Sequence, residues 1–90
     1  MEARTVTDLA SAAYLLSIGY KEILPREFKK GRTLVLYFEA CPKLEDDLNS
    51  YYAGTARVDP LTFTDHLTLL RQRLRREREA FRIKRDEEVI

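Results

Sequence analysis

The sequence predicts a small α+β domain, and three observations support this class. Apolar residues recur at helical spacing in residues 8–18 and again in residues 60–86. Between these segments, residues 21–39 form two β-prone runs separated by a Lys-Lys-Gly-Arg turn, which is typical of a β-hairpin. A shorter helical pattern follows Pro42. The expected order is helix, β-hairpin, short helix and long C-terminal helix (αββαα), with the helices packed mainly on one face of a small antiparallel sheet of two strands.

The composition is that of one folded domain. The chain has 90 residues, of which 44% are hydrophobic and 34% are charged, and its net charge is only +1. A single cysteine, Cys41, excludes an internal disulfide framework. The sequence has no apolar stretch long enough to span a membrane, and its first residues do not resemble a signal peptide. We therefore expect a cytoplasmic protein with no membrane association.

The first helix is expected over residues 8–18. Its apolar face combines residues three and four apart: Leu9, Ala12, Ala13, Leu16 and Tyr20. Thr5 or Thr7 is expected to cap the helix, since both precede it and have a side-chain hydroxyl that can accept a backbone N–H. Gly19 is expected to end it.

The hairpin follows as two unequal strands. Pro25 lies inside the first, residues 21–28, so this strand is expected to be an edge strand or to contain a bulge. Residues 29–32 form the turn, called the hairpin tip below, and the second strand spans residues 33–39. Its apolar side chains alternate between two faces, with Leu34, Leu36 and Phe38 on one and Val35 and Tyr37 on the other. The unpaired edges predict a homodimer with a four-stranded sheet.

Two helices complete the predicted domain. Pro42 opens a short helix that ends at Gly54, and Asp59 with Pro60 marks the start of the last helix as N-cap and first helical residue. The last helix has an apolar face for about five turns and continues to about Asp86: Phe63, Leu67, Leu70, Leu74 and Phe81. Its length predicts that the C-terminal half projects or packs on something else. We therefore divide the chain into a compact domain, residues 1–74, and an arginine-rich extension, residues 75–90.

The last helix also carries most of the basic charge. Residues 71–85 contain eight basic residues against Glu77 and Glu79, a local charge of +6 in a nearly neutral chain. Five of the eight share one helix face, called the arginine stripe below: Arg71, Arg75, Arg78, Arg82 and Arg85. At 100° per residue the stripe lies about 80° around the helix from the apolar face.

This charge pattern has three interpretations. The stripe could follow the phosphates of DNA or RNA, because arginine binds phosphate with a planar two-point fork. It could bind an acidic protein surface, or it could be a solvated face with the ion pairs Arg73–Glu77 and Arg75–Glu79. Two acids cannot neutralise eight bases, so we favour nucleic acid. The hairpin tip adds three more basic residues, which would strengthen this prediction if they shared a face with the stripe: Lys29, Lys30 and Arg32.

The alternative function is that of a protein–protein adaptor or subunit. In this hypothesis the long helix docks on a larger protein complex through its apolar residues Leu74 and Phe81. Val35 and Tyr37, on the second face of the strong strand, would belong to the same partner interface. Salt dependence separates the two hypotheses, because only phosphate binding releases counterions.

The residues for enzyme chemistry are few. His66 is the only histidine, and with Cys41 it supplies two metal ligands at most, where a zinc site needs three or four. The three glycines are isolated, so there is no phosphate-binding glycine loop. We therefore predict no catalytic residue, metal, cofactor or small-molecule substrate, and a protein that is not an enzyme.

Several short motifs, taken in order, resemble a known family. They are Thr7-Asp8-Leu9-x-x-Ala12-Ala13-Tyr14-Leu15-x-x-x-Gly19-Tyr20, Gly31-Arg32 before a strand ending Phe38-Glu39, Tyr51-Tyr52-x-Gly54, and Val58-Asp59-Pro60. The family comprises small uncharacterised domains, classed as a domain of unknown function, from bacteria, archaea and their viruses. The resemblance covers residues 5–74 and implies a stand-alone domain of phage or mobile-element origin, with no catalytic residues. The arginine-rich extension lies outside it.

Overall fold

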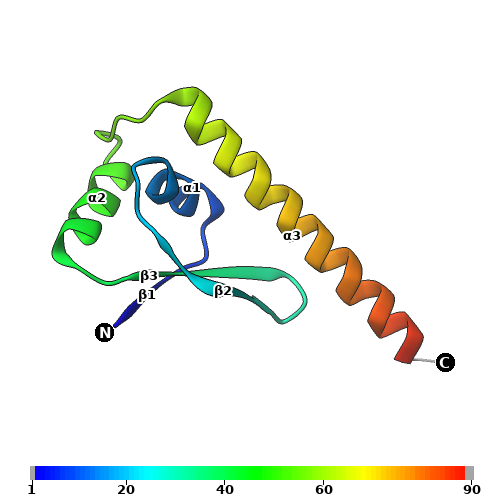
Figure 1. The fold of residues 1–90 in the computed structure, drawn as a ribbon. Helices are drawn as coiled ribbons and strands as arrows, with labels where there is room; N and C mark the ends of the chain where they lie inside the picture. The colour runs from blue at the N-terminus through cyan, green and yellow to red at the C-terminus, as the bar shows by residue number, and fades with distance from the viewer. Residues whose placement is uncertain (1, 89–90) are drawn as a thin grey trace.

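A computed structural model of the chain describes residues 2–88 and contains six elements of secondary structure. In chain order they are β1 (Ala3–Val6), α1 (Leu9–Ser17), β2 (Glu22–Lys29), β3 (Thr33–Glu39), α2 (Pro42–Tyr52) and α3 (Pro60–Glu88). The protein is an α+β domain, as the sequence predicts, and the four predicted elements α1, β2–β3, α2 and α3 appear in the predicted order (Figure 1).

The sheet has three strands, and the two-stranded prediction was wrong. The order is β1-β3-β2 with both pairs antiparallel, and β1 pairs with the second half of β3 from Val6 opposite Leu36 to Ala3 opposite Glu39. Strand β1 has only four residues, too few to recognise a strand from the alternation of apolar and polar side chains. Thr5, which lies in this strand, was instead expected to cap the following helix. The true N-cap of α1 is Asp8, whose side chain accepts the Ala10 N–H at 3.3 Å.

Strand β2 confirms both expectations that Pro25 raised. It lies at the edge of the sheet, and its pairing with β3 shifts register between Ile23 and Glu27, around the proline. Because β1 occupies the other edge of β3, the two edges of the sheet are β1 and the interrupted β2. The homodimer stays a prediction, but its four-stranded sheet was wrong, because two three-stranded sheets joined at an edge have six strands.

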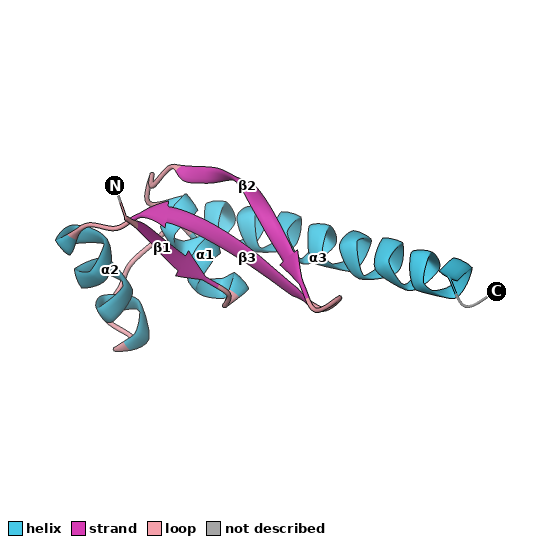
Figure 2. Ribbon diagram, turned by 90° about the horizontal axis from the view of Figure 1, so that it is seen from below, coloured by secondary structure: helices cyan, strands magenta, loops and turns pink. Residues whose placement is uncertain are grey.

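All three helices lie on the same side of the sheet, as predicted (Figure 1). When the molecule is seen from below, the strands pass in front of α1 and α3, and α2 lies beside them (Figure 2). The core forms between this face and the helices. Ala12 and Ala13 of α1 are fully buried, and their small side chains allow α3 to pack closely at Leu70, which is also buried. The core side chains of β3 are the three that alternation predicts: Leu34, Leu36 and Phe38.

Helix α3 begins as the sequence predicts and extends beyond the rest of the domain. Asp59 accepts the Thr62 N–H at 3.2 Å, and Pro60 is the first helical residue. The helix has 29 residues, about 43 Å at 1.5 Å per residue, in a molecule whose largest dimension is 51 Å. Its first half packs on α1, and its second half passes the tip of the β2–β3 hairpin (Figure 1).

Candidate nucleic-acid interface

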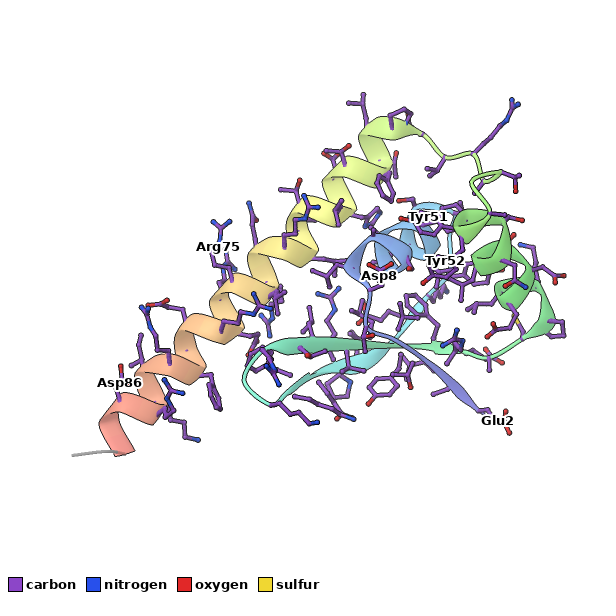
Figure 3. The ribbon with its side chains drawn as sticks, turned by 180° about the vertical axis from the view of Figure 1, so that it is seen from behind. Glu2, Asp8, Tyr51, Tyr52, Arg75 and Asp86 are labelled. Carbon is purple, nitrogen blue, oxygen red and sulfur yellow. The ribbon has the colours of Figure 1, made fainter. Side chains whose placement is uncertain are left out.

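The hairpin tip and the arginine stripe meet, although 46 residues separate their contacting members. The Arg78 guanidinium donates two hydrogen bonds to the Arg32 backbone carbonyl, from Nε at 3.2 Å and from Nη2 at 2.9 Å. The two basic clusters of the sequence therefore adjoin in the folded chain. The contact is made by Arg78, whereas Arg75 of the stripe extends to the side of α3 away from the sheet (Figure 3), so a shared face of tip and stripe stays a prediction.

A glycine at the tip makes this approach possible. Gly31 has φ +70°, a conformation that glycine adopts without strain, and a Cβ atom there would collide with the Phe81 ring of α3. The same ring meets Phe28 of β2 edge-on, with centroids 6.2 Å apart. Phe81 and Arg78 thus fasten the second half of α3 to the hairpin.

The arginine stripe borders a hollow that is open to solvent, and the residues that line it all belong to α3. Arg75 extends from α3 on the side away from the sheet (Figure 3). Leu74 and Glu79 also line the hollow, and the sequence analysis assigned neither of them to a nucleic-acid site. Four of the five predicted stripe residues take part: Arg71, Arg75, Arg78 and Arg82.

The arginines of the stripe have different partners. Arg82 Nη2 pairs with Glu79 Oε1 at 2.5 Å, so the predicted pairing of Glu79 with Arg75 does not form. The other predicted pair, Arg73–Glu77, forms at 2.9 Å. Within residues 2–86, whose side chains the structure describes, neither Arg71 nor Arg75 has an acidic partner. Their positive charges are therefore available to a ligand.

The basic side chains of the tip extend this surface. Lys29 lies 3.6 Å from Glu27, a long and exposed ion pair that contributes little. Lys30 and Arg32 are exposed, and their side chains have no ion-pair partner in the part of the chain that the structure describes. Arg85, the last residue of the stripe, is also exposed.

The residues predicted for a partner interface are largely used within the chain. Val35 is only 2% exposed, and Leu74 packs against the core. The Tyr37 hydroxyl donates to Glu27 at 2.7 Å, and this hydrogen bond is the main cause that raises the tyrosine pKa. Phe81 contacts the hairpin but remains 43% exposed, so it is the member with the most surface left for a partner.

The residues considered for enzyme chemistry lie apart from this surface. His66 is half-buried in the first half of α3, and Cys41 is partly exposed directly before α2. The described residues contain no group of three or more histidine, cysteine or acidic side chains placed to hold a metal ion. Among the described helices, none is long and apolar enough to cross a membrane.

The basic residues of this surface could be predicted from the sequence, but the contact between the stripe and the hairpin tip could not. Helical periodicity gives the stripe, because residues on one helix face follow from spacing alone. The Arg78–Arg32 contact could not be predicted from neighbouring residues, because it depends on how the hairpin packs against α3. The sequence predicts a turn at Gly31 and an apolar helix face that includes Phe81, but no pattern in it predicts that the two residues are in contact.

Comparisons with protein-family models, curated proteins and solved structures find no match to this chain. The resemblance of residues 5–74 to small domains of unknown function therefore stays a prediction. What this surface can bind follows from its own geometry and charge.

Proposed function

We propose that this protein binds DNA or RNA through the phosphate backbone and catalyses no reaction. The observation that carries the proposal is the contact between Arg78 and the Arg32 carbonyl. It joins the basic face of α3 to the basic hairpin tip. A surface of this kind suits a polyanion, because each additional phosphate contacted releases counterions and adds to affinity.

Arg71 and Arg75 are the strongest candidates for phosphate contact. Both lack an acidic partner among the described side chains, so neither has to leave an ion pair before binding. Arginine is well suited to this role, because its planar fork offers paired donors to phosphate oxygens and its charge persists at every physiological pH. Lys30 and Arg32 of the tip would add to the positive charge that attracts the nucleic acid.

An acidic protein surface would also be attracted to these charges. The absence of a long apolar groove along the stripe favours nucleic acid, since most of the residues around the hollow are charged. A helix–helix contact would need an apolar seam on the same face. The hollow beside the stripe is bordered by one apolar residue, Leu74, which is already packed against the core.

The proposal is tested by measuring binding of the full chain to fluorescent DNA and RNA over a range of salt concentrations. Affinity should fall linearly on a log–log plot, because phosphate contacts release counterions. The double variant Arg71→Ala/Arg75→Ala should weaken binding to all sequences alike and reduce the slope by about two, roughly one for each phosphate contact. Arg76→Ala/Lys84→Ala is the matched control, because it also removes two positive charges from exposed side chains of α3, both off the stripe. Equal effects of the two variants, or no binding at low salt, would refute the proposal.

The second candidate function is that of a protein–protein adaptor, and the observation that favours it is the exposure of two large apolar residues of α3. Leu69 and Ile83 are 62% and 51% exposed, and helical spacing puts them about 100° and 140° around α3 from the core residue Leu70. Binding of a protein partner at these residues should be insensitive to salt and should be lost in the variant Leu69→Ser/Ile83→Ser.

A cytoplasmic location and a phage or mobile-element origin are also part of the proposal, and only the sequence supports them.

A further inference from the structure

The turn at the hairpin tip contains a strained residue. The Arg32 N–H donates to the Lys29 carbonyl at 3.2 Å. The two residues between them, Lys30 and Gly31, have φ of 57° and 70°. A turn with two such residues is usually built from asparagine or aspartate followed by glycine, because few other residues adopt a positive φ without strain. Among residues 2–88, Lys30 is the only residue other than glycine in this conformation.

Packing explains the glycine of this turn but not the lysine. A Cβ atom at Gly31 would collide with the Phe81 ring of α3, so the close approach of the helix requires glycine there. The Lys30 side chain is exposed and has no ion-pair partner within the described residues. Asparagine in its place would fit the turn with less strain. Strained residues cluster at functional sites, where the side chain contributes something other than stability.

The charges around the turn also oppose the folded conformation. Lys30 and Arg32 are basic, and Arg78 of α3 brings a third positive charge to the Arg32 carbonyl, at 2.9 and 3.2 Å. The nearby acid, Glu27, pairs with Lys29 at 3.6 Å, and no ion pair of the described residues includes the other three charges. Like charges held close together repel one another. A bound anion would offset this repulsion.

We infer that Lys30 is a phosphate-binding residue, and that the tip contacts a phosphate of the nucleic acid separately from Arg71 and Arg75 of the stripe. The inference rests on the proposed function and adds a second binding element to it. A lysine ammonium suits the position, because it is a compact charge on a flexible stem and needs no fixed orientation to contact a phosphate oxygen. The lysine thus favours binding at a position where asparagine would favour stability.

The variant Lys30→Asn should make the protein more stable and its nucleic-acid complex weaker. Its melting temperature should rise by about 2–6 °C, because asparagine is less strained at a positive φ. Binding is measured with fluorescent single-stranded DNA, single-stranded RNA and duplex DNA of equal length. For the probe that the unmodified chain binds most tightly, the slope of log affinity against log salt should fall by about one.

Lys29→Asn is the matched control, because it removes the same charge from the tip at a residue whose φ is not positive. It should change the melting temperature by less than about 2 °C and the slope by less than about half as much as Lys30→Asn does. Lys30→Arg keeps both the charge and the strain, so its melting temperature and slope should match those of the unmodified chain.

Two results would overturn this inference and leave the proposed function standing. In the first, Lys30→Asn weakens binding no more than Lys29→Asn does. In the second, Lys30→Asn does not raise the melting temperature. If the unmodified chain binds none of the three probes at low salt, the inference and the proposed function are both overturned.

Discussion

The two halves of α3 belong to different parts of the molecule. In the first half, Leu70 is buried, and Phe63 and Leu67 pack against the core that α1 and β3 complete. Among residues 75–86 every side chain except Glu77 is exposed, and Phe81 and Arg78 hold the helix to the hairpin tip. One continuous helix therefore supports the fold along one part of its length and presents charge along the other. Substitutions in the first half of α3 should therefore affect stability, and substitutions in the second half should affect binding.

The largest expected effect on stability lies in the compact half. Leu70 is only 1% exposed in the first half of α3, so Leu70→Ala should lower the free energy of unfolding by about 2–4 kcal/mol. Ile83→Ala, in the exposed half of α3, should change it by less than about 0.5 kcal/mol. Urea denaturation of both variants measures the difference. Similar values would mean that α3 contributes to stability along its whole length.

The next effect tests the contact between the second half of α3 and the hairpin tip. Gly31→Ala must adopt a positive φ and also displace the Phe81 ring, and we expect a loss of about 1–2 kcal/mol. Gly54→Ala is the matched control, because Gly54 has φ +78° and no atom within 4 Å of its added Cβ. The excess loss in Gly31→Ala reports the contact with Phe81. Equal losses would show that the ring moves aside at no cost.

A smaller effect is the pH dependence of stability that Tyr20, in the compact domain, should cause. Burial, followed by a 2.6 Å hydrogen bond to Asp47, raises the pKa of Tyr20 above its ordinary value of 10.0. The fold therefore favours the neutral phenol, so this stabilisation is complete below pH 10 and is lost as the pH rises above it. Tyr20→Phe cannot ionise and should lose less stability above pH 10 than the unmodified chain. Thermal denaturation between pH 8 and pH 11 tests this, and parallel curves would contradict it.

The sequence predicts elements well where a local rule determines them. Asp59-Pro60 gives the start of α3, and Pro25 gives an edge strand with a bulge, because capping and the missing proline N–H act within a few residues. Strand β1 escaped prediction because pairing with β3 makes it a strand, and its partner lies more than 30 residues away. The stripe was predictable for the same local reason as α3, but its junction with the tip was not.

The smallest effect distinguishes two arginines of the same stripe. Arg78 bonds to the Arg32 carbonyl, so Arg78→Ala should cost about 0.5–1.5 kcal/mol locally and speed amide hydrogen exchange at the hairpin tip. Arg75→Ala removes an exposed side chain with no acidic partner among those described, and should leave tip exchange unchanged while weakening nucleic-acid binding. Both variants lose one positive charge, so electrostatics alone would affect them equally. A difference in exchange at the tip would therefore separate the arginine that joins the two regions from the arginine that is available to a ligand, whereas equal exchange would mean that Phe81 alone holds α3 to the hairpin.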